Sequence, residues 1–315
     1  MNETKGNQSE LALIRYIRNR FPKRRREILK GIGDDALVFR DGIIISTDSF
    51  FEGVHFDMTY FSPYVLGYHC MAASLSDLAA MAASPICALV SLNLTQNVSK
   101  KEVGELYSGF EKITKKYKMD IAGGDIVASP AFGMTITVIG HAKKPLMRSG
   151  ARPGQALYVT NFLGLAEIGR RALRDKLPQK EYPDAIEKHL CPEPRIFEAQ
   201  SLSRYSTACI DTSDGLSTDA FHLAEESRVK IVINEEHIPI HPEVGKLCSI
   251  EKIDPLEFIL SAGEDFELLF TAWRIPKIPK VKIFKIGTVV KGRGLYLSKR
   301  GGIKRIQPSG YEHLR

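Results

Sequence analysis

The chain has 315 residues, of which 43% are hydrophobic and 26% charged, and 44 Lys and Arg against 37 Asp and Glu give a formal net charge of +7. This composition is ordinary for a globular protein, and the length allows two domains. The most apolar stretch, residues 71–94, is interrupted by Asp77 and Pro85, which argues against a membrane protein. The polar first residues do not resemble a targeting peptide, and five cysteines without C-x-x-C spacing do not indicate disulfides, so we expect a cytoplasmic protein.

The excess positive charge is densest at residues 23–26, Lys-Arg-Arg-Arg. Such a run could bind nucleic acid, but it could equally be a solvated helix end. No C2H2 spacing and no aromatic-rich RNP pattern accompanies it, so we expect no nucleic-acid partner. The charge suits small molecules that carry phosphate equally well.

The first predicted elements are a helix and a hairpin. Ser9 can cap a helix that ends before Pro22 and that we expect to pack on a sheet. Two apolar runs, 37–39 and 43–45, are joined by a turn at residues 41–42, which predicts a β-hairpin.

Acidic residues flank this hairpin. Antiparallel pairing should bring Asp34, Asp35 and Asp48 to one edge of the sheet. Two carboxylates about 5 Å apart repel by roughly 3 kcal/mol at a dielectric constant of about 20, so the group needs a cation or protons. A Mg²⁺ site and a solvated hairpin end both remain open at this point.

A long helix is predicted from Pro63 to Met81, with Ser62 as its N-cap. In its small-residue segment, residues 73–84, Asp77 is the only charged side chain, and the small residues indicate that another backbone lies close. A buried carboxylate without a partner is costly, which favours a metal or substrate role for Asp77 over a capping hydrogen bond.

The rest of the first half continues as strand 86–94, a helix with a capping box at Ser99 and Glu102, and strand 132–140. Between the last two lies Gly123-Gly124-Asp125, whose glycines could let backbone amides approach a phosphate, although such triplets often only turn a corner. This order of elements predicts an α/β layer of at least four strands.

We place a domain boundary in the Gly-, Pro- and charge-rich stretch 143–153, which gives domains 1–146 and 147–315. The second half is predicted to contain strands at residues 156–160, 229–233, 266–271, 283–290 and 295–297. Three helices are predicted: one at residues 165–174, one that ends near residue 205 and one that starts at residue 216. Asp211 and Asp214, with Ser213 between them, start the last of these helices. They could form a second metal or phosphate site, or simply cap the helix.

These motifs occur without a Walker A sequence, a protein-kinase motif set, a nucleophile elbow or an H-E-x-x-H sequence. In order along the chain they read GIGDDA, ISTDSFFEGVHF, SLSDLAAM, AGGD, RSGARPG, DTSDGL, SAGEDFEL and GYEHL. This ordered set resembles the thiamine-monophosphate kinase family, within the superfamily that includes aminoimidazole ribonucleotide synthetase, over nearly the whole chain.

The resemblance implies a two-domain α/β (α+β) fold, with an N-terminal α/β domain whose sheet pairs across a homodimer and a C-terminal α/β sandwich. It implies ATP-dependent phosphorylation of thiamine phosphate with several Mg²⁺ ions. The implied metal ligands are Asp35, Thr47, Asp48, Asp77, Asp125, Asp211 and Asp214. ATP would also contact Gly124, Arg148 and Ser213, and thiamine phosphate would contact His55, Glu264 and Tyr311.

The chain departs from the family pattern at Phe51, Ala82, Ser84 and Ile126, where Ala82 stands in place of the usual glycine. We interpret these departures as packing changes, except that Ile126 could remove a polar contact near the nucleotide.

We expect direct in-line phosphoryl transfer with no protein nucleophile, because the acceptor is already a phosphate oxygen anion. Two alternatives remain: a cyclising purine synthetase of the same superfamily, and a basic, metal-containing nucleic-acid-binding protein.

Overall fold

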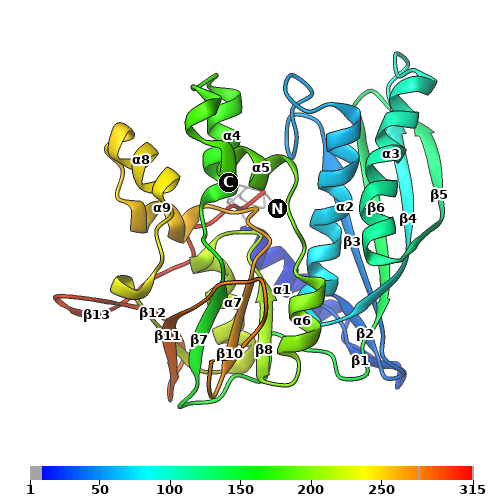
Figure 1. Cartoon of the computed structure of the whole chain (residues 1–315). Coiled ribbons are helices and arrows are strands. Elements are labelled where there is room, and N and C mark those ends of the chain that lie inside the picture. Colours follow the sequence, from blue (N-terminus) through cyan, green and yellow to red (C-terminus); the bar gives the residue numbers. More distant parts are fainter. Residues whose placement is uncertain (1–8, 276, 314–315) are drawn as a thin grey trace, which may run out of the picture.

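The computed structural model describes residues 9–275 and 277–313, and their strands form two sheets with helices packed on them (Figure 1). The first sheet has six strands in the order β1-β2-β3-β6-β4-β5, and the second has seven in the order β13-β12-β9-β11-β7-β10-β8. The fold is therefore mixed α/β with two sheets, as predicted. The pairs β4–β5 and β9–β12 are parallel, and the other neighbouring pairs are antiparallel.

The first half contains α1 (Glu10–Arg20), β1 (Ile28–Lys30), β2 (Leu37–Phe39), β3 (Ile43–Phe51), α2 (Pro63–Ala80), β4 (Ser84–Leu94), α3 (Lys100–Tyr117), β5 (Asp120–Ala128) and β6 (Gly133–His141). The second half contains β7 (Ala156–Thr160), α4 (Leu165–Arg174), η1 (Gln179–Glu181), α5 (Pro183–Leu190), α6 (Ile196–Leu202), β8 (Ser206–Asp211), α7 (Leu216–Ser227), β9 (Lys230–Asn234), η2 (Glu235–His237), α8 (Pro242–Glu251), α9 (Pro255–Ser261), β10 (Leu268–Ala272), β11 (Ile283–Val290), β12 (Gly294–Lys299) and β13 (Gly302–Arg305). None of the helices among these described residues is long and apolar enough to cross a membrane.

The predicted hairpin is confirmed. Leu37 pairs with Ile45 and Val38 with Ile44, so β2 and β3 are antiparallel. Gly42, at φ +92°, donates its N–H to the carbonyl of Phe39 at 3.1 Å and closes the turn. This conformation favours glycine because a Cβ atom would strain it.

Helix α2 lies at the centre of the molecule. It packs on β3 and β6 of the first sheet and on β8 and α6 of the second half, so one core includes apolar side chains from both halves. A close backbone approach on this helix occurs at Gly67, outside residues 73–84 for which it was predicted: a Cβ atom there would lie 2.1 Å from the carbonyl oxygen of Leu106 in α3. The site described below forms around the C-terminal part of α2.

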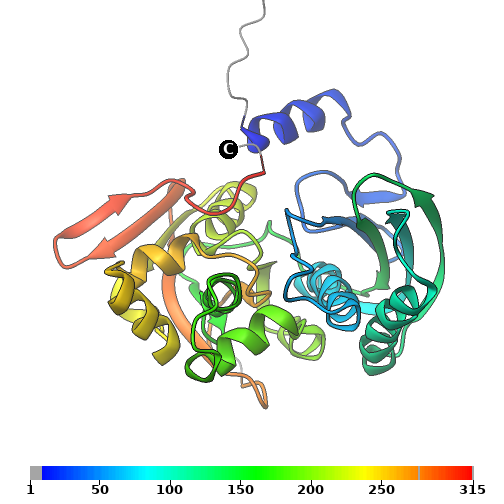
Figure 2. The same cartoon turned by 90° about the horizontal axis from the view of Figure 1, so that it is seen from above.

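Helix α1 does not pack on a sheet, so that expectation is wrong. It has no buried residue, and the side chains of Ile14, Ile17 and Phe21 are exposed. It is held by polar contacts instead, among them the ion pair between Arg18 and Glu226 of α7. Figure 2 shows α1 outside both sheets and beside the end of the C-terminal segment.

Candidate functional site

A cavity of about 830 Å³ lies between the two halves of the chain. Its walls come from β3, the C-terminal part of α2, the β8–α7 connection, the loop before β10 and the C-terminal segment. Most of the predicted site residues line it: Thr47, Asp48, His55, Asp77, Asp211, Ser213, Asp214, Glu264 and Tyr311. Tertiary structure thus gathers residues that are up to 264 positions apart, from Thr47 to Tyr311.

Three carboxylates meet beside this cavity. Oxygen atoms of Asp35, Asp77 and Asp211 all lie within 4.8 Å of one another. Asp35 precedes β2, Asp77 lies near the end of α2 and Asp211 ends β8. Neither sheet alone could make this group, because α2 must bring Asp77 to the ends of strands from both.

Serine hydroxyls and one arginine hold these carboxylates. Ser46 donates to the Asp77 carboxylate, and Ser76 donates to Oδ2 of Asp211 at 2.6 Å. The Arg148 guanidinium pairs with Oδ1 of Asp35 at 2.8 Å. Neither serine was among the predicted site residues. Both could have been found from the sequence, because they immediately precede Thr47 and Asp77 in two of the motifs.

The positive charge of the described side chains around these carboxylates does not balance their negative charge, as their raised pKa values indicate. Burial, followed by the charge of Asp48, raises the pKa of Asp77 well above its ordinary value. Burial and Asp35 raise the pKa of Asp211 to about 7, and burial raises the pKa of Asp48 to about 6. Oδ2 of Asp35 is buried and has no hydrogen-bond partner among the described residues. An oxygen-rich group with an orphaned buried acceptor fits a hard cation such as Mg²⁺.

Glu264 lies on a strained loop in the cavity wall. It has φ +63°, and Phe266 two residues later has φ +48°. Asp265 holds the loop by accepting from the N–H groups of Gly164 and Ala166 at 2.5 and 3.0 Å. Such strain persists only where surrounding contacts impose it. Burial and the charge of Glu167 raise the pKa of Glu264 to about 7, while Arg170 opposes the shift.

Aromatic rings form another part of the wall. The ring of His55 lies 5.8 Å from Phe50 and 5.2 Å from His313, and His313 in turn lies 4.9 Å from Tyr311. Burial, with a smaller contribution from His313, lowers the pKa of His55. His313 was not among the predicted site residues, although it belongs to the same terminal motif as Tyr311.

Gly124 and Asp125 are not brought to the carboxylates within this chain. Asp125 pairs with Ser91, Ser91 with Thr135, and Thr135 with Ser49, so all four share one row across the sheet. Side chains alternate along a strand, which puts Asp125 on the face opposite to Asp48. A Cβ atom on Gly124 would lie 1.8 Å from the carbonyl oxygen of Val90, so close strand packing accounts for this glycine.

A second cavity, of about 850 Å³, meets the first at Thr47. Five basic residues, Arg18, Lys23, Arg24, Arg25 and Lys30, line it together with Asp34 and Asp35. The dense cationic run therefore borders an open pocket next to the carboxylates. Its chemistry suits a polyanionic small molecule.

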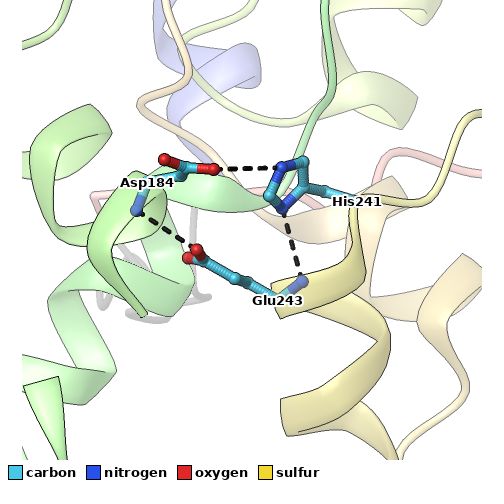
Figure 3. Close-up of side chains that lie close together, drawn as sticks. All are labelled: Asp184, His241 and Glu243. Carbon is cyan, nitrogen blue, oxygen red and sulfur yellow. Dashed lines mark hydrogen bonds and ion pairs between the residues drawn. The ribbon is translucent and has the colours of Figure 1, made fainter. Parts of the chain in front are cut away.

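Another group with metal-ligand composition, Asp184, His241 and Glu243, lies outside both cavities (Figure 3). The Glu243 carboxylate accepts from the N–H groups of Asp184 and Ala185 at 3.2 and 2.9 Å, which caps α5. His241 accepts from the N–H of Glu243 at 3.3 Å and faces Asp184 at 3.5 Å. These contacts already occupy the three side chains, so we interpret the group as a connection between α5 and α8.

Comparison with known proteins agrees with this arrangement. Residues 33–142 match the family model described as AIR synthase related protein, N-terminal domain. The chain is 33% identical to thiamine-monophosphate kinase of Aquifex aeolicus over 292 residues, 90% of this chain and 93% of that one. It is 33% identical to the Bacillus subtilis enzyme of the same name, with the same two shares covered. The solved structure described as AaThiL complexed with AMPPCP and TMP superposes with a TM-score of 0.89, at 30% identity and 99% coverage of both chains.

Proposed function

The chain belongs to the thiamine-monophosphate kinase family, and from this premise we propose that it transfers the terminal phosphate of ATP to thiamine monophosphate, forming thiamine diphosphate. One observation carries the proposal: the carboxylate group of Asp35, Asp77 and Asp211 lies beside a cavity that also has an aromatic and acidic wall. A flat, cationic ring system that bears a phosphate needs both features.

Mg²⁺ ions would be held by Asp35, Asp48, Asp77, Asp211 and Asp214, with Thr47 at the junction of the two cavities. When bound, Mg²⁺ supplies positive charge that screens the phosphates of donor and acceptor from each other. Ser46 and Ser76 keep two of these carboxylates oriented, and Arg148 fixes Asp35.

We assign the acceptor to the first cavity and the nucleotide to the second. The acceptor's phosphate would lie toward the carboxylates and its ring toward His55, Glu264 and Tyr311. The basic wall formed by Lys23, Arg24 and Arg25 would face the nucleotide. Ser213, which lines the first cavity, and Arg148, which pairs with Asp35, would contact those phosphates that reach the carboxylates between the two cavities. In this arrangement the reacting groups meet between the two cavities, beside Asp35, Asp77 and Asp211.

The transfer is direct and in line. The acceptor oxygen of a phosphate is already anionic, so the residues around it must position two anions and need not remove a proton. No protein nucleophile takes part, and the side chains act by binding, orientation and charge.

The active form is a homodimer in which the first sheets of two copies pair. Strand β5 is the edge of its sheet and is exposed along most of its length, and Leu89 and Val127 are exposed on the face that carries Asp125. Covering that face with a second copy would bury these apolar side chains and place Gly124 and Asp125 at the interface. Their metal and nucleotide roles then belong to a site shared between copies.

The test is to incubate the purified protein with ATP, Mg²⁺ and each of several phosphorylated vitamins, and to measure product masses. We expect one added phosphate on thiamine monophosphate and ADP in equal amount. A phosphorylated protein on the reaction path would contradict direct transfer. Salt-sensitive binding to DNA without ATP turnover would contradict the kinase assignment altogether.

A further inference from the structure

The C-terminal segment, residues 309–313, lies across the start of α7 and forms part of the wall of the first cavity. The N–H of Gly310 donates to Oγ1 of Thr218 at 3.1 Å, and the N–H of Tyr311 donates to the carbonyl of Asp214 at 2.9 Å. A Cβ atom on Gly310 would lie 2.0 Å from that same carbonyl oxygen, so the segment is pressed against the helix start. Its path up to Tyr311 is thus fixed by contacts within the second half.

Beyond Tyr311 the segment is held by the other end of the chain. The N–H of Glu10, in the first turn of α1, donates to Oε1 of Glu312 at 2.9 Å. The N–H of His313 donates to Oε2 of Glu10 at 3.0 Å. These two reciprocal hydrogen bonds join residues about 300 positions apart, and we call them the terminal clasp. A carboxylate at the first turn of a helix also interacts favourably with the helix dipole.

The terminal clasp holds the main chain of His313, and the Tyr311 hydroxyl lies 3.5 Å from Nδ1 of its ring. That ring stands between His55 and Tyr311, at 5.2 and 4.9 Å, and all three rings line the cavity. Because α1 buries no side chain, the position of its first turn depends on polar contacts at its two ends, with Arg18 and Glu226 at the far end. A change at Glu10 therefore acts on the cavity wall and not on a hydrophobic core.

We propose that His313 contacts the ring of the acceptor and that Glu10 is a positioning residue for acceptor binding, acting through the main chain of His313. The inference rests on the proposed function, since it takes thiamine monophosphate as the molecule in the first cavity. The planes of His55 and His313 are inclined by 53° and those of His313 and Tyr311 by 89°, so a flat cationic ring can stack on one of them and meet the others edge-on. It also gains cation–π attraction to tyrosine.

The test measures binding of thiamine monophosphate and of AMPPCP separately by calorimetry with Mg²⁺ present, together with KM values for thiamine monophosphate and ATP. Glu10→Ala should weaken thiamine monophosphate binding about three- to tenfold, as expected for loss of one hydrogen bond of ordinary net strength. Glu10→Gln keeps an acceptor oxygen and should recover most of this loss. AMPPCP binding should stay unchanged in both variants.

His313→Ala and Tyr311→Ala should each weaken thiamine monophosphate binding by up to about tenfold. Adding Glu10→Ala to His313→Ala should cause little further loss, because Glu10 acts through the residue already truncated. Glu111→Ala, which removes an exposed glutamate of α3 whose side chain pairs with Lys115, is the matched control and should bind as the unchanged protein does.

Equal weakening of thiamine monophosphate and AMPPCP binding by Glu10→Ala would overturn the inference, since Glu10 would then support the fold in general. Full additivity of the double variant would overturn it as well. If Glu10→Ala bound thiamine monophosphate as well as the unchanged protein does, the inference would be overturned and the proposed function would not be affected. An unchanged protein that binds no thiamine monophosphate overturns the proposed function and the inference with it.

Discussion

At the scale of single residues, Asp77 and Asp48 carry the largest expected effects on turnover. Asp77→Asn and Asp48→Asn should each lower kcat about a hundredfold or more, because each removes a charged ligand oxygen from the proposed metal site. Both variants should fold, and without Mg²⁺ their free energy of unfolding should be unchanged or higher, since repulsion between carboxylates is relieved. Steady-state kinetics across Mg²⁺ concentrations and urea denaturation test the two parts.

Near-normal turnover at limiting Mg²⁺ would remove the substituted residue from the set of metal ligands. Asp41→Asn is a suitable control, because Asp41 lies in the exposed turn of the β2–β3 hairpin and lines neither cavity.

Glu264 predicts a pH dependence of acceptor binding. With its pKa raised to about 7, the carboxylate loses its charge as the pH falls through 7, and with it the attraction to a cationic ring. KM for thiamine monophosphate, measured over a range of pH that spans the pKa of about 7, should therefore rise as the pH is lowered.

Glu264→Gln removes this titration. A phosphate group also titrates near pH 6, so part of the dependence should remain in the variant. Identical pH profiles of the variant and the unchanged protein would exclude Glu264 as the titrating group.

At the scale of elements, the end of α2 contains a conformation that its sequence does not favour. Ala82 follows the helix at φ +54°, where glycine is the usual residue, and Ala83 donates its N–H to the carbonyl of Leu78 at 2.8 Å. The departure at Ala82 is therefore a backbone effect and not only a packing change. Ala82→Gly should raise the free energy of unfolding by about 0.5 to 1 kcal/mol, after the entropic cost of glycine is subtracted.

Urea denaturation of Ala82→Gly and of Ala83→Gly provides the comparison. Ala83 does not have positive φ, so glycine there should destabilise the protein. If Ala82→Gly also destabilised it, strain at this helix end would be excluded.

Strand β10 is attached to the helices of the second half by a buried charged network. Glu267 is fully buried, pairs with Lys188, and accepts from Arg195 at 2.6 Å and from Thr160 at 2.6 Å. Glu267→Gln leaves two cations without a full countercharge and should lower the free energy of unfolding by about 3 kcal/mol. Glu257→Gln, at an exposed position of α9, should change it by less than about 0.5 kcal/mol. Equal stability of the two variants in urea would mean that the network contributes little.

At the scale of the whole molecule, the uncovered face of the first sheet predicts the oligomeric state. Leu89→Lys and Val127→Lys place charge on the exposed outer face and should weaken the dimer at least about tenfold, as light scattering at several protein concentrations can measure. Ile250→Lys, at a still more exposed apolar position of α8, should leave the mass unchanged.

Turnover should fall together with dimer content, since Asp125 would no longer reach a partner's site. A protein that is a monomer before any substitution would contradict both the dimer and the shared site. A Leu89→Lys monomer with full activity would contradict only the sharing.

The local elements, and the kind of chemistry that the motifs support, could be predicted from the sequence alone. The β2–β3 hairpin, α2 and α3 were predicted from the turn residues at 41–42, the Ser62 and Ser99 caps and the apolar periodicity. These signals suffice because each acts between residues that are close in the sequence. The lone charge of Asp77 in an apolar helix already required a partner. The ordered motifs were specific enough to indicate the family.

Which of these residues meet depends on the packing of elements that are far apart in the sequence. Asp35, Asp77 and Asp211 converge because α2 packs between the two sheets, a contact that no local pattern encodes. The position of α1 away from a sheet, the place of the His313 ring beside His55 and the clasp of Glu10 with Glu312 depend on contacts across nearly the full chain. For Asp125 the motif predicts a metal ligand, but the alternation of side chains along β5 places this residue on the outer face of the sheet, away from the other carboxylates.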